Sequence, residues 1–320
     1  MKNNLIVSYA PHIHGNQNIR NIMLDVIIAL IPALIGGIYF FGLNALVTVV
    51  TSVAFCVLAE YVWDKATKKE NTTKDLSAIV TGILLAYCLP AGTPLYMVAV
   101  GDIFAIIVVK CFYGGIGQNF VNPALAARAF LLACWPVALT TYHAPSDPLG
   151  LFCNGIDVTS GATPLNIIKH GGEAISNANL FWGNVSGCIG EVSAFLILLG
   201  AAYLLIKRVI DLVIPLTYIV SVGIFGVLFT DCGFIYHILS GGVMLAAFFM
   251  ATDYATSPVS KGGQFVFALG AGLITAVIRA FGGYPEGVTY AILIMNIITP
   301  LLDKHMRPRL FGSKAVKNNG

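Results

Sequence analysis

The chain has 320 residues, of which 57% are hydrophobic and only 10% are charged. Soluble domains carry roughly 25% charged residues, so the composition excludes an ordinary soluble protein and predicts one integral membrane domain over residues 1–320. The formal net charge of +3 excludes little, because the positions of Lys and Arg orient a membrane protein. The seven cysteines show no CxxC or Cys/His spacing, so the sequence predicts no iron–sulfur or zinc site of its own.

Apolar windows long enough for helices fill nearly the whole chain. A bilayer core of ~30 Å needs about 20 helical residues, and we expect an all-α integral membrane protein with about ten transmembrane helices. The third window, bounded by Asp75 and Pro90, is too short for a full crossing. In chain order the predicted segments are 22–41, 45–63, 76–89, 95–113, 123–139, 185–206, 212–229, 234–250, 265–281 and 287–302.

The positions of Lys and Arg predict the orientation of these segments. With the N-terminus in the cytoplasm and ten crossings, only Lys169 and Arg279 of the 18 basic residues fall outside, and Arg128 lies within the fifth segment. This asymmetry follows the positive-inside rule. Both termini are therefore expected in the cytoplasm, and residues 141–184 form an external loop.

Five segments precede that loop and five follow it, which predicts an inverted repeat. The first repeat covers 1–140, the second covers 185–303, and 304–320 is a basic cytoplasmic tail. The third and eighth segments share a short pattern, TGILLA at 81–86 and GGVMLA at 241–246, and both are expected to be short or interrupted. Glycine-rich helices of unrelated origin can also look alike, so the similarity leaves both interpretations open.

Charged and polar residues inside the apolar segments are candidates for function, because burying them in lipid is costly. Asp102 lies in the fourth segment and could bind Na⁺ or carry a proton, or else form a structural pair with Arg128. Asp253, in FMATDYATSP, sits among hydroxyl side chains that suit a hard cation or an ordinary turn. Asn119 and Asn122 lie in GGIGQNFVNPA, where Asn122 and Pro123 favour a helix start.

No Walker loop, dinucleotide-binding glycine pattern or hydrolase triad occurs in the chain, so the sequence predicts no ATP, NAD or hydrolase site. No nucleic-acid partner is expected either.

One polar stretch in the external loop, DVTSGATP at 157–164, resembles the flavinylation motif D-x-x-[ST]-G-A-T of membrane redox subunits. Asp157, Ser160, Gly161, Ala162 and Thr163 match it position by position. In the motif the phosphate of FMN is esterified to the final threonine, so the resemblance implies covalent FMN at Thr163. A small Gly-Ala pair would let an extended loop enter the modifying enzyme.

The wider chain resembles the NqrB/RnfD family, which unites the B component of Nqr with the D component of Rnf. The matching stretches are DLSAIVTGILLAYCLP, GGIGQNFVNPALAARAFL, FMATDYATSP and GGYPEGVTYAILIMN. The short region before the first segment favours the Rnf component. The resemblance implies an electron-carrying subunit of a ferredoxin:NAD⁺ oxidoreductase complex in the cell (inner) membrane, coupled to Na⁺ or H⁺ translocation.

The same resemblance implies further cofactors and partners. A second, noncovalent flavin, riboflavin, is expected among the helices, with Asn119 and Asn122 as candidate contacts. The expected partners are the A, B, C, E and G components of Rnf and a flavin transferase during maturation. Two alternatives remain at this point: a quinone-reducing component of the NqrB type, and a non-redox permease of small solutes with the same inverted-repeat fold.

Overall fold

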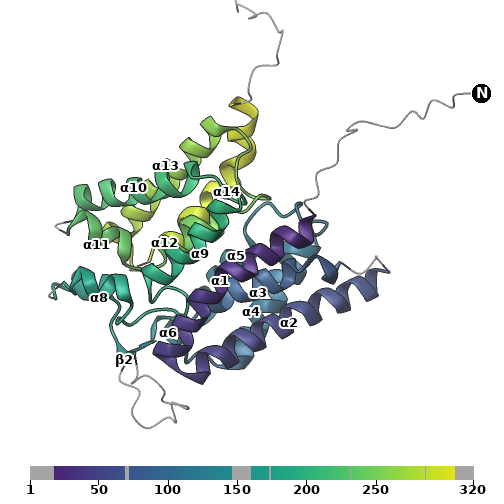
Figure 1. The fold of residues 1–320 in the computed structure, drawn as a ribbon, viewed down its shortest axis with the longest axis horizontal. Coiled ribbons are helices and arrows are strands. Elements are labelled where there is room, and N and C mark those ends of the chain that lie inside the picture. Colours follow the sequence, from purple (N-terminus) through teal and green to yellow (C-terminus); the bar gives the residue numbers. More distant parts are fainter. Residues whose placement is uncertain are drawn as a thin grey trace, which may run out of the picture.

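The computed structural model describes residues 18–68, 72–145, 160–172, 174–230, 232–284 and 286–306. Helices make up most of this part of the chain, and the described strands are one antiparallel pair of two residues each. Figure 1 shows the helices lying side by side, with α1 beside α9.

The elements follow one another in three groups. The first group is α1 (Ile19–Phe41), α2 (Leu43–Thr67), the 3₁₀ turn η1 (Thr73–Asp75), α3 (Ser77–Tyr87), α4 (Leu95–Ile103), its π-helical continuation η2 (Phe104–Cys111), α5 (Pro123–Cys134) and α6 (Pro136–Thr140). The connection holds β1 (Tyr142–His143), β2 (Ser160–Gly161), α7 (Pro164–Lys169) and α8 (Asn177–Trp182). The last group is α9 (Ala194–Ile206), α10 (Val213–Phe229), α11 (Phe234–Leu239), α12 (Val243–Leu245), the π-helical η3 (Ala246–Met250), α13 (Lys261–Phe281) and α14 (Val288–His305).

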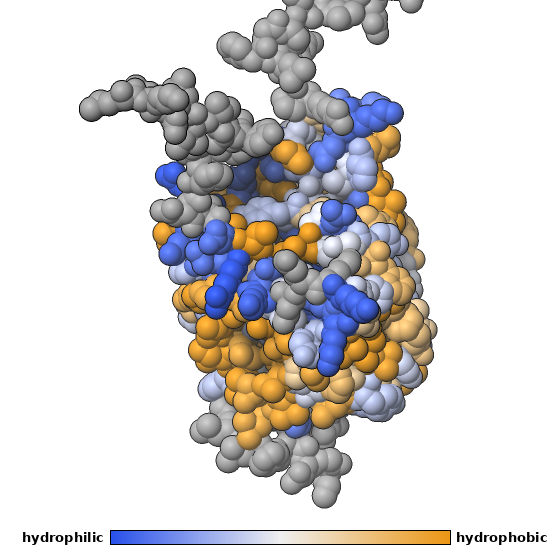
Figure 2. Space-filling view, turned by 90° about the vertical axis from the view of Figure 1, so that its right-hand side faces the viewer, coloured by the Kyte–Doolittle hydropathy of each residue, from blue (hydrophilic) through white to orange (hydrophobic). Residues whose placement is uncertain are grey.

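The surface is that of a membrane protein. Within the described ranges α1, α2 and α13 are each long and apolar enough to cross a bilayer, and α3, α5, α9 and α10 are shorter apolar helices. Large apolar side chains are exposed on several of them, for example Ile35, Val62 and Leu228, as expected where lipid replaces water. Figure 2 shows hydrophobic residues over the lower part and the right edge of one face, with hydrophilic residues gathered above them.

Most of the predicted segments are helical in the structure, and the third and eighth are short or interrupted as expected, whereas ten membrane crossings stay a prediction. The third is the short α3, only 11 residues long. The eighth is broken between α11 and α12 at Ser240–Gly242, where Gly241 takes the left-handed φ of 63°. Glycine adopts that conformation at little steric cost, and the break leaves two helix ends inside the protein.

Two predicted segments are wrong in extent. The fifth ends at Trp135, whose φ of −132° and ψ of 64° are not helical, because the following Pro136 disfavours the helical conformation. The sixth begins as a helix only at Ala194. Residues 185–193 instead run beside the end of α3, where the Ile189 and Gly190 N–H groups donate to the carbonyls of Leu89 and Tyr87.

The helices of the first and last groups pack mainly within their own group, which is compatible with the predicted five-plus-five repeat. In the first group α2 packs against α3 and α4, and in the last group α10 packs against α11 and α13. The two groups meet mainly along α1 and α9. The repeat, and the division of the chain that follows from it, stay predictions.

Candidate functional site

The predicted attachment residue, Thr163, lies where β2 leads into α7. Tyr142 pairs with Gly161 and His143 with Ser160, and Thr163 is the N-cap of α7, its hydroxyl oxygen accepting a hydrogen bond from the Asn166 N–H. The Thr163 residue is 4% exposed. Because the cap uses a lone pair of the oxygen and not its proton, the hydroxyl hydrogen stays available for replacement.

The structure describes only part of the rest of the motif. Gly161 packs closely against Ser186: a Cβ there would lie 2.1 Å from the Ser186 Oγ, so a larger residue would require the Ser186 side chain to move. Ala162 continues the chain to Thr163. Asp157 lies outside the described residues, and only the backbone pairing of Ser160 is described. The motif's C-terminal part is anchored to α11, since the Tyr236 hydroxyl donates to the Pro164 carbonyl at 2.9 Å.

A small cavity, with about 290 Å³ of empty space that is partly open to solvent, is lined by Thr163 and by two carboxylates. Its lining includes Thr163, Ser186, Glu191, Gly241 and Glu286. The threonine hydroxyl predicted to carry a flavin therefore shares a cavity with the break in the eighth segment and with buried charge.

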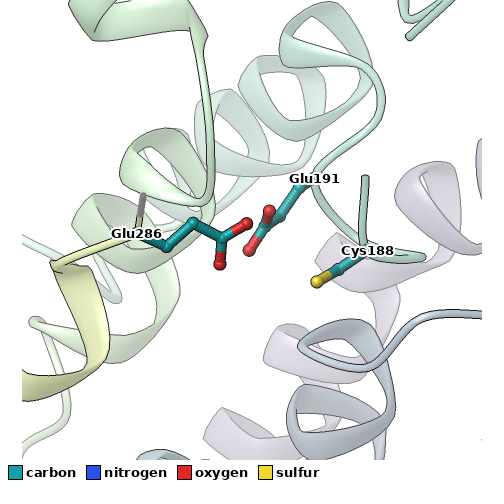
Figure 3. A group of neighbouring side chains, drawn as sticks. All are labelled: Cys188, Glu191 and Glu286. Atoms are coloured by element: carbon teal, nitrogen blue, oxygen red, sulfur yellow. The ribbon is translucent and has the colours of Figure 1, made fainter. Parts of the chain in front are cut away.

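Arg128 holds those two carboxylates. Its guanidinium lies 3.3 Å from Glu191 and also pairs with Glu286, and all three side chains are at most 11% exposed. The Tyr142 hydroxyl donates to Glu286 at 3.2 Å, which ties β1 to the same group. Figure 3 shows Glu191 and Glu286 directing their carboxylates toward each other, with the Cys188 thiol nearby.

This group has the ligand spacing of a metal site but not its charge. The Cys188 sulfur and the two carboxylate oxygens all lie within 4.8 Å of one another. The Arg128 guanidinium already bonds both carboxylates, so it supplies the positive charge that a cation would bring. We therefore interpret the group as a buried ion-pair network.

A second arginine binds the carbonyl groups at the break between α11 and α12. Arg279, on α13, donates to the carbonyls of His237 and Ser240 at 2.8 Å each. These carbonyls belong to the end of α11, where helix carbonyls lack intrahelical partners. At the other side of the break, a Cβ on Gly242 would lie 2.5 Å from the Glu191 carboxylate, so the carboxylate reaches the start of α12.

The largest described pocket lies elsewhere and contains three other predicted site residues. It offers about 820 Å³ of empty space, part of it open to solvent, and is lined by Asn119, Asn122, Lys110 and Asp253 together with apolar residues of α1, α3, α9 and η3. The structure thus brings together Asn119, Asn122 and Asp253, which the sequence could only suggest one at a time.

The individual roles of these residues differ. Asn122 caps α5 through its side-chain oxygen and donates to the Met250 carbonyl at 3.3 Å, so much of its bonding capacity is structural. Asn119 donates to the Val121 carbonyl. Asp253 accepts from the Ala255 N–H and the Thr256 hydroxyl, and burial raises the pKa of its carboxyl.

The pocket and the C-terminal end of the connection that holds Thr163 lie at opposite ends of α1. Ile22 and Met23, near the start of α1, line the pocket. At the other end, a Cβ on Gly183 would lie 3.0 Å from the Phe40 ring. The 17 helical residues between Met23 and Phe40 span about 26 Å.

Asp102 belongs to neither site. Its carboxylate is fully buried and contacts the Ser52 hydroxyl at 2.6 Å and the Cys56 thiol at 3.3 Å, both on α2. The predicted structural pair with Arg128 is wrong, because Arg128 turns instead toward Glu191 and Glu286.

Sequence reasoning also missed the association of Arg128, Glu191 and Glu286. A buried arginine needs anionic partners, and that signal is present in the sequence. It cannot say which carboxylates supply them, since the three residues are separated by as many as 158 positions.

Comparison with known proteins gives the family. Residues 6–312 match the family described as "NQR2, RnfD, RnfE family". The chain is 48% identical over 98% of its length to the D component of the Na⁺-translocating ferredoxin:NAD⁺ oxidoreductase complex of Acetobacterium woodii, covering 97% of that protein. It is 41% identical, over 98% of both chains, to the D component of the proton-translocating ferredoxin:NAD⁺ oxidoreductase complex of Clostridium ljungdahlii.

A more distant relative extends the same pattern. The chain is 34% identical to the D component of the ion-translocating oxidoreductase complex of Actinobacillus succinogenes, with 95% of this chain and 96% of that one covered. The fold, the matching region and these relatives agree: the chain belongs to the NQR2, RnfD, RnfE family.

Proposed function

We propose that this chain is the D component, the membrane electron-transfer component, of an Rnf-type ferredoxin:NAD⁺ oxidoreductase complex. The relatives with 48% and 41% identity are named as the D components of such complexes, and the identity extends over nearly the whole chain. This favours an Rnf-type component over one of the NqrB type. The expected partners are the A, B, C, E and G components of Rnf.

Covalent FMN at Thr163 is the central part of the proposal, and the motif DVTSGAT carries it. The phosphoester would form between the Thr163 Oγ and the phosphorus of FMN, supplied by a flavin phosphoanhydride on the flavin transferase. The leaving phosphate departs with the electron pair of the broken anhydride bond, and the hydroxyl proton passes to solvent. The ester oxygen retains a lone pair for the Asn166 N–H.

In the structure Thr163 is buried, so modification requires the β2–α7 turn to open toward the transferase. In the described part of the connection, the hydrogen bonds of β2 and α7 to other elements are few: β1 and β2 pair over two residues each, the Tyr236 hydroxyl donates to the Pro164 carbonyl, and Lys169 donates to the Gly282 carbonyl. Such a segment can open at low cost relative to the helices.

The large pocket is the proposed place of a second, noncovalent flavin such as riboflavin. Its mixture of apolar walls with amide and charged groups suits a flat aromatic ligand with polar edges. Asn119 would be the more available polar contact, because Asn122 is occupied as a helix cap. Two flavins at opposite ends of α1 would provide one electron-carrying cofactor on each side of the membrane.

The orientation follows the distribution of basic residues. We place both termini and the large pocket on the cytoplasmic side of the cell membrane, and Thr163 on the outer side. Electron transfer would be coupled to movement of Na⁺ or H⁺, with Asp102 and Asp253 as the candidate ion-binding residues in this chain. A flavin has no use in a plain permease, so flavinylation separates the two functions.

The test is co-expression with a flavin transferase, followed by a denaturing gel read for flavin fluorescence. We expect a fluorescent band from the native chain and none from Thr163→Val, which keeps the shape of the side chain but lacks the hydroxyl. Thr163→Ser is the matched control and should retain at least part of the signal. A dark native band beside a fluorescent known substrate of the same transferase would contradict the proposal.

A further inference from the structure

The buried face of α2 carries a column of polar side chains that no part of the proposed flavin site uses. Ser52, Cys56, Glu60 and Asp64 occur four residues apart, so they lie on one face of the helix. Their exposed fractions are 0, 0, 2 and 5%. A run of four such groups inside a membrane helix is costly unless it has a function.

Asp102 faces the Ser52 end of this column. The number of protons available for its hydrogen bonds indicates its protonation state. The Ser52 Oγ lies 2.8 Å from the Gly82 carbonyl and 2.6 Å from the Asp102 Oδ1. A hydroxyl has one proton to donate. If it donates to the carbonyl, the short contact with Oδ1 needs a proton on the Asp102 carboxyl.

The surroundings of Asp102 agree with a neutral carboxyl. Its second oxygen, Oδ2, is buried with no hydrogen-bond partner among the described residues. No ion pair of the described residues involves Asp102: Arg128 is bonded to Glu191 and Glu286, and Lys110 to Glu60. A buried carboxylate without a cationic partner pays a large desolvation cost, which protonation removes.

Protons are also too few for the carboxylates at the Asp64 end of the column. The Thr72 hydroxyl lies 3.0 Å from the Glu60 Oε1 and 2.9 Å from the Asp64 Oδ2. One hydroxyl proton cannot satisfy both carboxylates. Lys110 bonds Glu60 at 2.6 Å and the Ser77 hydroxyl at 2.7 Å, so it balances only one of the two negative charges.

The Asp102 site suits a proton better than a metal ion. Hard cations such as Na⁺ prefer several oxygen ligands, whereas Asp102 is offered one hydroxyl and one thiol. Space is short as well, because a Cβ on Gly82 would lie 2.9 Å from the Val53 Cα. The helices α2 and α3 therefore close over the site.

We propose that Asp102 is a proton-binding carboxyl, and that the polar face of α2 exchanges its proton with the end of the helix at Asp64 and Thr72. Buried titratable groups on the packed elements have partners of their own: Cys56 with Asp102, Lys110 with Glu60, Arg128 of α5 with two carboxylates, and Tyr87 of α3 with the Leu30 carbonyl. The proposal deepens the ion-translocation part of the proposed function, but its test needs no flavin.

Infrared difference spectroscopy of the purified full-length protein, without transferase, tests the protonation. We expect a carbonyl band of a protonated carboxylic acid at neutral pH that is absent in Asp102→Asn, decreases at alkaline pH and does not respond to Na⁺. Asp25→Asn is the control, because Asp25 bonds Tyr203 outside the column. Absence of an Asp102-dependent band at every pH, or its loss on adding Na⁺ at fixed pH, would overturn the proposal.

Deuterium exchange of the same band tests the route. Thr72→Val removes the bridging hydroxyl without changing any charge, and we expect exchange at Asp102 to become about tenfold slower, as when one hydrogen bond of a path is lost. An unchanged exchange rate in Thr72→Val would contradict exchange along α2. Neither outcome depends on Thr163, so failure here would leave the flavin proposal standing.

Discussion

Two of the buried carboxyl sites in the described part of the protein are stabilised in opposite ways. Glu191 and Glu286 share one guanidinium, that of Arg128. Asp102 has only a hydroxyl and a thiol as partners. Because the energetic cost of a buried charge must be met by a countercharge or removed by a proton, the first site is expected to be ionic and the second neutral.

The way in which each buried carboxyl is stabilised determines what its site can do. An ion-pair network between α5, the 185–193 segment and the turn before α14 fixes geometry, here next to the cavity that is lined by Thr163. A neutral carboxyl beside a polar column can release its proton along that column and take it back. Substitutions should therefore act on stability at the first site far more than at the second.

The largest effect is expected from Arg128→Gln. The change leaves Glu191 and Glu286 buried without a cation, and breaking a buried pair in this way costs about 3–5 kcal/mol. The midpoint of thermal unfolding in detergent should fall markedly. The double variant Arg128→Gln with Glu286→Gln should recover part of the loss, and a double variant no more stable than the single one would contradict the ionic description.

An intermediate effect is expected from Glu286→Gln alone. Arg128 keeps its pairing with Glu191, and the amide oxygen can still accept from the Tyr142 hydroxyl. The loss is that of one charge-assisted hydrogen bond, about 1.5–3 kcal/mol. Unfolding midpoints of Glu286→Gln and Arg128→Gln measured side by side should differ in this order, and the reverse order would refute the network as described.

The smallest effect is expected from Ser52→Ala. The variant removes one hydroxyl between α2 and α3, and a typical neutral hydrogen bond contributes about 0.5–1.5 kcal/mol. A drop as large as that of Arg128→Gln would mean that Asp102 is ionised and depends on Ser52 for its stability. Denaturation in the same detergent provides the comparison.

Much of the fold can be read from local sequence properties. Hydropathy and proline positions place most of the helices, and Gly241 with Gly242 marks the break in the eighth segment. Residues 185–193 could not be assigned correctly, because their apolar side chains look like part of a helix. Their actual conformation depends on backbone bonds to Tyr87 and Leu89, about a hundred positions earlier in the chain.

The candidate sites divide in the same way. A contiguous motif can be read directly, so the sequence alone is enough to single out Thr163. The partners of Asp102 and Arg128 come from separate segments and depend on side-chain directions that no periodicity gives. The π-helical η2, which carries Lys110 toward Glu60, has no signal in the sequence at all.

The most direct test of the central claim is the mass of the tryptic peptide that contains Thr163, taken from the native chain produced together with its flavin transferase. We expect an added mass equal to FMN less one water, located on Thr163 by fragmentation. An unmodified peptide from a preparation in which the transferase is active, or the same added mass on another residue, would contradict it.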